Sequence, residues 1–209
     1  QPLLDEPMMQ IFATFGLVIL LENIVLASTR GVPRTTRTAY STSTLDLGIA
    51  TVSVPRLVVL VVAIAIAVAL PLYLRRSMLG TAVRAVAFDR RAARLMGINV
   101  ERVYMLTFGV GAALAALAGV LLAPIYTATP GIGFNFILPA FAVVILGGLG
   151  SIAGAFIGGM IVGLVEAFSG FYIDPSLKQA IWFLLFVAVL VVRPSGLLGR
   201  AGEEEAGFR

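Results

Sequence analysis

The sequence contains neither cysteine nor histidine in its 209 residues. Disulfides, Cys/His metal sites, Ser-His-Asp triads and Cys-His dyads are therefore excluded together. A hydrolase would need a buried Ser/Lys or Asp/Asp pair, and neither kind of pair is visible in the apolar segments. We expect no enzyme, no catalytic residue, and no metal or cofactor bound by this chain.

Charge is scarce as well. Charged residues make up 12% of the chain and hydrophobic residues 59%, whereas roughly 25% of an ordinary soluble domain is charged. So few charges cannot cover a water-exposed surface, and lipid is the solvent that fits. The net charge is +4, but the basic residues lie between apolar runs. Membrane topology explains them better than nucleic-acid binding does.

Long apolar runs are what the sequence has instead. About 20 residues are needed for a helix to cross the hydrocarbon core, and in lipid every backbone polar group must find its partner within the protein. We predict membrane helices at 8–27, 57–74, 103–123 and 177–192. The fold class expected is an all-α polytopic bundle with a Gly-rich short-helix or re-entrant hairpin, in a single transmembrane domain over 1–209.

The Gly-rich segment 137–168 allows two interpretations. One is a short helix, a tight glycine turn at 147–151 and a second helix. The other is one long tilted helix. An even number of crossings here keeps both flanking segments on one side of the membrane, which favours the first interpretation.

Arginine is distributed unevenly between the predicted spans. Seven of the fifteen basic residues lie in 75–102: Arg75, Arg76, Arg84, Arg90, Arg91, Arg94 and Arg102. The positive-inside rule places this segment in the cytoplasm, together with 193–209, and it places 124–136 and 169–176 outside. The segment 28–56 would then be external, although it carries Arg30, Arg34, Arg37 and Arg56.

The segment 75–102 has the signals of a short helix. Asp89 is a good N-cap residue, the following residues Arg90, Arg91, Ala92, Ala93 and Arg94 favour helix, and Gly97 can take the left-handed turn that ends one. Asn99 can then cap the next span. A basic loop that only sets orientation is the alternative, but two caps and an alanine pair favour a docking element that a partner approaches closely.

Three separated sequence blocks resemble the permease subunits of branched-chain amino acid ABC importers, the first of the two permeases more closely than the second. The blocks are Arg84-Ala-Val-Ala-x-Asp-x-x-Ala-Ala-x-Leu-x-Gly-Ile-Asn-x-x-Arg102, the glycine-rich run from Phe141 to Gly159, and the ending Arg193-Pro-Ser-Gly-Leu-Leu-Gly199. The resemblance covers about 1–200. In this family an Ala-Ala-x-x-x-Gly element docks on the ATPase subunit, which Ala92, Ala93 and Gly97 match. Arg91 departs from the family, where a Glu often precedes the alanine pair.

The resemblance implies a translocation subunit in a prokaryotic plasma (inner) membrane. Its expected partners are a second permease subunit in a homo- or heterodimer, two cytoplasmic ATPase subunits that use ATP, and an external substrate-binding protein. The chain itself contains no Gly-x-x-x-x-Gly-Lys-Ser/Thr motif, so energy has to come from those partners. The substrates implied are branched-chain amino acids. A urea or amide permease, or a channel or secondary transporter without an ATPase, is the alternative.

Small and polar residues inside the spans are further candidates for the pathway or for helix packing. Small residues recur at four-residue spacing in two places, Gly111, Ala115 and Gly119 in one and Gly150, Gly154 and Gly158 in the other, and Gly147 and Gly148 lie at the predicted turn. Small residues at this spacing let helices pack closely in lipid, and bare backbone can also line a pathway. Glu22 and Asn23 lie within the first span, where a charge usually faces protein or water. Structural and substrate-binding roles both stay open.

The chain begins at Gln1, without a methionine or the basic segment of a signal peptide. We expect it to be the C-terminal part of a longer permease whose upstream spans are absent.

Overall fold

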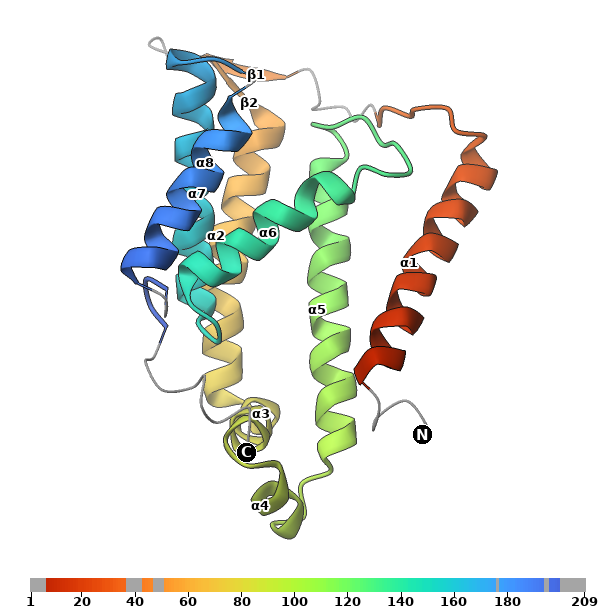
Figure 1. The fold of residues 1–209 in the computed structure, drawn as a ribbon, viewed down its shortest axis with the longest axis vertical. Helices are drawn as coiled ribbons and strands as arrows, with labels where there is room; N and C mark the ends of the chain where they lie inside the picture. The colour runs from red at the N-terminus through yellow and green to blue at the C-terminus, as the bar shows by residue number, and fades with distance from the viewer. Residues whose placement is uncertain (1–6, 37–42, 47–50, 176, 194–195, 200–209) are drawn as a thin grey trace.

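The computed structural model describes residues 7–36, 43–46, 51–175, 177–193 and 196–199. Eight helices and one short hairpin follow one another in these residues (Figure 1). Their bounds are α1 Pro7–Thr29, β1 Thr44–Asp46, β2 Thr51–Ser53, α2 Val54–Arg76, α3 Met78–Phe88, α4 Arg90–Leu95, α5 Val100–Leu122, α6 Phe134–Gly147, α7 Ile152–Tyr172 and α8 Lys178–Val192. The all-α prediction is confirmed.

Four of these helices are long and apolar enough to cross a membrane, namely α1, α2, α5 and α7. Three of them match the spans predicted at 8–27, 57–74 and 103–123 to within three residues at each end, and α8 matches the fourth. Pro71 lies inside α2 without ending it. Helices α6 and α8, with 14 and 15 residues, are shorter apolar elements.

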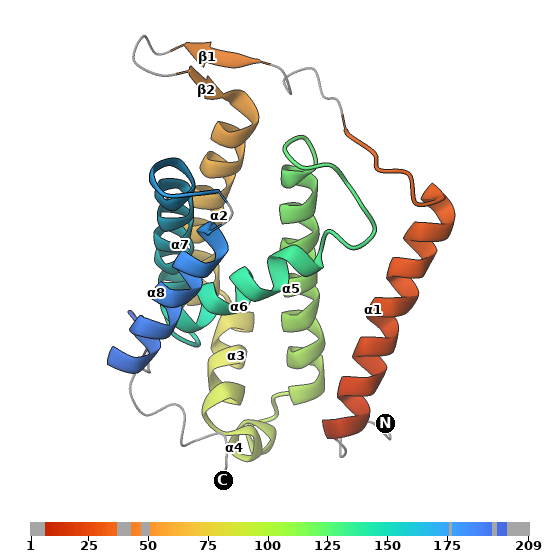
Figure 2. The ribbon, with the colours of Figure 1, turned by 45° about the horizontal axis from the view of Figure 1, so that its top comes forward.

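The Gly-rich segment forms two helices, so the alternative of one long helix is wrong. Helix α6 ends at Gly147, and Gly148 and Gly150 have positive φ values of 98° and 83° that only glycine adopts readily. Ser151 caps α7 by accepting the Gly154 amide at 3.0 Å. The turn therefore lies at 147–151, as predicted, and α6 crosses the bundle obliquely in both views (Figures 1 and 2).

The connections gather at two opposite ends of the bundle. The β1–β2 hairpin lies at one end, and α3 and α4 lie at the other (Figure 2). Backbone bonds in both directions join Arg34 and Ala128, with N–O distances of 3.0 and 2.8 Å. This pairing places 28–36 on the same side as 124–133, as the topology scheme requires. Arg37 and most of 193–209 lie outside the described residues.

One core cluster joins the last three helices. Ala142, Leu146, Val162 and Trp182 are buried together, on α6, α7 and α8. The segment after α8 returns to the α6–α7 turn, where the Leu197 and Leu198 amides donate to the carbonyls of Leu146 and Gly147 at 2.8 and 3.1 Å. The α6–α7 turn is thus held in place by α6, by α7 and by residues 197–198.

Candidate functional site

A helical tip projects beyond the long helices at one end of the bundle. Helices α3 and α4, with the connection to α5, form this α3–α4 tip, residues 78–99 (Figure 1). Helix α3 begins after Ser77, whose hydroxyl accepts the Gly80 amide at 3.1 Å. Sequence analysis missed this helix. The signal was a serine N-cap followed by apolar Val83 and Val86 at helical spacing.

Both predicted caps of the second helix are formed. An oxygen of the Asp89 carboxylate accepts from the amides of Arg91 and Ala92 at 2.7 and 3.0 Å. Gly97 has φ of 82°, and its amide donates to the Arg94 carbonyl at 3.0 Å. The Ile98 amide reaches the Ala93 carbonyl at 3.0 Å, completing a Schellman motif. Helix α4 is therefore fixed at both ends.

The N-cap of α5 is also formed as predicted. The Asn99 side-chain oxygen accepts the Arg102 amide at 3.0 Å, and Glu101 lies in the first turn, where a negative charge favours the helix dipole. The connection from α4 to the long helix α5 is thus only four residues, 96–99, and is hydrogen-bonded at both ends. A displacement of α4 would be passed directly to α5.

A small buried cluster holds the tip together. Val86, Ala93, Val100 and Val103 are buried against one another, and they come from α3, α4 and α5. The expectation that both alanines lie open to a partner needs correction, because Ala93 is 4% exposed and packs inward. Only Ala92 faces outward.

The outer surface of the tip is apolar, which sequence analysis did not foresee. Phe88, Leu95 and Met96 are 92%, 89% and 82% exposed, although they lie beyond the four membrane-spanning helices. Side chains of this kind are costly to leave in water, and an exposed apolar patch is typical of a surface that meets another protein or a membrane. From the sequence, the arginines near these residues had indicated only a charged surface.

The arginines of α4 lie around this apolar surface. Arg90 stacks on the Tyr104 ring of α5, with its guanidinium carbon 5.5 Å from the ring centroid. Arg91 and Arg94 are exposed, and Arg94 lies in the last turn, where a cation favours the helix dipole. A basic rim around an apolar centre suits a partner with an acidic rim.

The Asp89 cap makes α4 sensitive to acid. The amides of Ala92 and Arg91 hold the pKa of this carboxyl below its ordinary value of 3.8. A carboxyl with a depressed folded pKa contributes stability above its unfolded pKa and loses it as the pH falls through the folded pKa. We expect the protection of the Arg91 and Ala92 amides against hydrogen exchange, relative to the intrinsic exchange rate at each pH, to fall below about pH 4. Asp89→Asn, which can still cap, should remove that dependence; an unchanged pH profile would contradict this role.

Glycines allow α6 and α7 to pack with their backbones in contact. A Cβ atom at Gly147 would overlap the Gly154 backbone, one at Gly154 would overlap the Gly147 carbonyl, and one at Gly158 would lie 2.8 Å from the Val143 carbonyl oxygen. The expected stripe on α7 is shorter than predicted, because Gly150 lies in the turn before the helix. For Gly147, Gly154 and Gly158 the geometry favours close packing.

The glycines of α5 are in a different environment. Within the described residues, nothing lies within 4 Å of a Cβ atom at Gly111 or Gly119. This stripe therefore does not pack within the chain, and its role as a pathway lining or a subunit contact stays a prediction.

The two polar residues predicted within the first span, Glu22 and Asn23, lie in different environments on α1. The Asn23 side-chain amide donates to the Ile19 carbonyl of its own helix at 2.8 Å. Glu22 is half-buried, and it lines a hollow of about 330 Å³ with apolar residues of α1, of the segment leading into α6 and of the start of α6. Glu22 Oε1 is 3.3 Å from the position that a Cβ atom at Gly131 would take. A role of Glu22 or Asn23 in substrate binding stays a prediction.

The family model described as "Branched-chain amino acid transport system / permease component" matches residues 7–190. The chain belongs to this family. The permease is 43% identical to the high-affinity branched-chain amino acid transport system permease protein LivH of Escherichia coli K12 over 157 residues, which are 75% of this chain and 51% of LivH. It is 36% identical to BraD of Pseudomonas aeruginosa over 200 residues, 93% of this chain and 65% of BraD.

A more distant relative is the ribose import permease protein RbsC of Escherichia coli K12, 32% identical over 163 residues, 74% of this chain and 50% of RbsC. No solved structure matches the permease significantly. The chain spans about half to two thirds of the length of these relatives. Membership in a transport family confirms that this is not an enzyme, and with the four apolar helices it confirms a multi-pass inner-membrane protein.

Proposed function

We propose that this permease carries branched-chain amino acids through the membrane as a subunit of an ABC importer, driven by separate ATPase subunits that dock on the α3–α4 tip. The relatives LivH and BraD, named as branched-chain amino acid permeases, support the substrate class. The observation that carries the docking proposal is the rigid tip, with its apolar surface at Phe88, Leu95 and Met96. A basic topogenic loop would need neither the caps nor this surface.

The tip is built to transmit movement. Helix α4 is capped at both ends and shares its buried cluster with α3 and α5, and α3 follows α2 after the single residue Ser77. An ATPase that moves α4 would thus move two membrane-spanning helices together. In this proposal an external binding protein delivers the substrate, and a second permease subunit, identical or different, completes the pathway. In this proposal the coupling element predicted within 75–102 is the α3–α4 tip, residues 78–99.

The similarity to RbsC means that the identity of the transported substrate needs a direct test. A relative named for ribose import has the same kind of permease chain, so the scaffold by itself does not select an amino acid. A urea or amide substrate, or transport without an ATPase, remains the alternative. Reconstitution with its partner subunits, followed by uptake of labelled leucine, ribose and urea, separates these outcomes; leucine uptake that requires ATP is the expected result.

Glu22 is the residue proposed to meet the substrate ammonium group. Its hollow combines one carboxylate with the apolar side chains of Leu21, Val25 and Phe134, and a branched-chain amino acid presents an ammonium group beside an aliphatic side chain. Charge-assisted hydrogen bonds contribute about 1.5–3 kcal/mol, so Glu22→Gln should lower leucine uptake about tenfold or more. ATPase association should stay normal.

Asn23→Ala is the matched control for Glu22, because Asn23 is its neighbour on α1 and, among the described residues, its side chain bonds to its own helix. That variant should keep full uptake. Equal losses in both variants, or wild-type uptake by Glu22→Gln, would remove Glu22 from the pathway and leave it a structural residue.

A further inference from the structure

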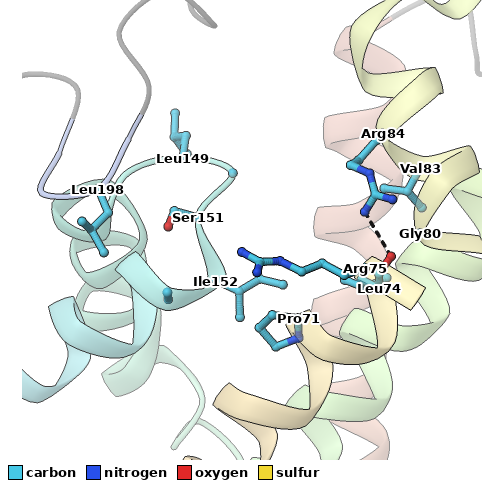
Figure 3. A pocket seen from close by; sticks show the side chains of 12 residues that line it. Pro71, Leu74, Arg75, Gly80, Val83, Arg84, Leu149, Ser151, Ile152 and Leu198 are labelled. Atoms are coloured by element: carbon cyan, nitrogen blue, oxygen red, sulfur yellow. Dashed lines mark hydrogen bonds between the residues drawn. The ribbon is translucent and has the colours of Figure 1, made fainter. Parts of the chain in front are cut away.

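A basic cleft lies where α3 of the α3–α4 tip meets the end of α2, and its lining does not include Phe88, Leu95 or Met96, the apolar surface proposed for the ATPase. It has a volume of about 610 Å³ and is drawn in Figure 3. One wall is the end of α2 with the start of α3, including Arg75 and Arg84, and the other is the α6–α7 turn with Ser151 and Ile152. Two cations therefore line a cleft at the end of the long helix α2.

The two arginines differ in what they contact. The Arg84 guanidinium donates to the Leu74 carbonyl at 3.0 Å and to the Thr81 hydroxyl at 3.3 Å, so it satisfies the end of α2 while keeping its charge at the cleft. The Arg75 side chain extends across the cleft toward Ser151 and Ile152 (Figure 3). Among the residues that the structure describes, no acceptor or carboxylate pairs with Arg75. The Arg75 guanidinium carries five N–H donors that can bind an anion.

An apolar cleft of about 360 Å³ adjoins the basic one. Ile152 lines both clefts, and on α2 the lining continues from Leu70 in the apolar cleft to Pro71 in the basic cleft. The apolar walls come from α2, α5 and α7: Val59, Ala63, Ile66, Ala67, Leu70, Leu114, Ala118, Leu121, Leu122, Ile152 and Phe156. The combined surface is basic at the end of the helices and apolar along the membrane-spanning part.

We propose that this surface binds one anionic phospholipid, with its phosphate at Arg75 and Arg84 and an acyl chain along the apolar cleft between α2, α5 and α7. Basic pockets between membrane helices on the cytoplasmic side suit anionic lipid headgroups. A free phosphate would use the basic part alone, whereas the adjoining apolar part fits a molecule that is both anionic and aliphatic. The lipid would lie between α2 and the α6–α7 hairpin.

The test is native mass spectrometry of the delipidated full chain in detergent, titrated with phosphatidylglycerol, with phosphatidylcholine of the same acyl chains, and with inorganic phosphate. Phosphatidylglycerol should bind about tenfold more tightly than phosphatidylcholine. Both lipids carry an anionic phosphate, but the quaternary ammonium of phosphatidylcholine cancels its net charge and is repelled by the two arginines. Inorganic phosphate should not displace it. Equal binding of the two lipids, or displacement by phosphate, would overturn the proposal.

Two variants localise the site. Arg75→Gln should lower phosphatidylglycerol binding about tenfold, whereas Arg76→Gln, the adjacent arginine outside the cleft lining, should leave it unchanged. Ala67→Leu should lower the binding of both lipids by filling the apolar part. Among the described residues no side-chain hydrogen bond or ion pair of Arg75 would be lost in the variant, and circular dichroism checks that each variant keeps its helices. Equal effects at Arg75 and Arg76, or no effect of Ala67→Leu, would refute a lipid site here.

Discussion

Leu95→Asp should reduce ATPase co-purification with the permease at least about tenfold, because the docked complex would bury an unpaired carboxylate. Leu95 is 89% exposed at the end of α4, so the change removes no packing contact inside the chain. Insertion and folding should be normal, and substrate-stimulated ATP hydrolysis should fall with the association. The measurement is ATPase recovered per permease after affinity purification in detergent.

Met78→Gln is the matched control for the tip. Met78 is as exposed as Leu95, at 89%, but it begins α3 at the end away from α4. Removing its apolar surface should leave the ATPase bound. Ala93, by contrast, is a poor probe of docking, since a charge at that buried position would break the α3–α4–α5 cluster. If Leu95→Asp and Met78→Gln bound the ATPase equally, the apolar surface of α4 would not be the docking site.

Gly154→Leu should prevent α6 and α7 from packing. A Cβ atom at this position already overlaps the Gly147 carbonyl, and this obstacle is backbone, which cannot rotate away as a side chain can. Overpacking costs about 1–3 kcal/mol where neighbours can shift, and we expect ~3 kcal/mol or more here. A loss of this size corresponds to a melting temperature lower by at least about 6 °C, measurable by thermal denaturation in detergent.

Gly163→Leu gives the comparison for Gly154 on the same helix. In the described residues nothing lies within 4 Å of a Cβ atom at Gly163, so the identical substitution should leave expression and the melting temperature near those of the wild type. A normal melting temperature for Gly154→Leu, or the same loss at both positions, would show that close α6–α7 packing does not stabilise the fold.

The features predictable from the sequence are those fixed by local chemistry. Asp89, Gly97 and Asn99 form their caps as predicted because each acts on backbone groups within four residues of itself. The glycine turn at 147–151 follows from positive φ values that other residues resist. The long spans follow from apolar length alone.

The features that sequence analysis missed depend on packing between distant segments. Nothing in the alanine pair says which member faces inward; Ala93 is buried because α3, a helix not foreseen, lies over it. In the same way, Gly154 meets Gly147 while Gly111 and Gly119 face open space in the described residues, although Gly154, Gly111 and Gly119 all lie in small-residue stripes of the sequence. The basic cleft forms because the α6–α7 turn lies beside the end of α2. The spacing of residues along the sequence does not reveal that these two segments are neighbours.

The most direct test of the account is a photoreactive amino acid placed at Met96, 82% exposed at the end of α4, in the permease assembled with its partners in native membranes. Illumination should join the permease to an ATPase subunit, identified by mass spectrometry of the cross-linked peptide, and Leu95→Asp should abolish the product. The same group at Met78 should give little or none. A product with lipid or an external protein instead would contradict the docking of an ATPase on the α3–α4 tip.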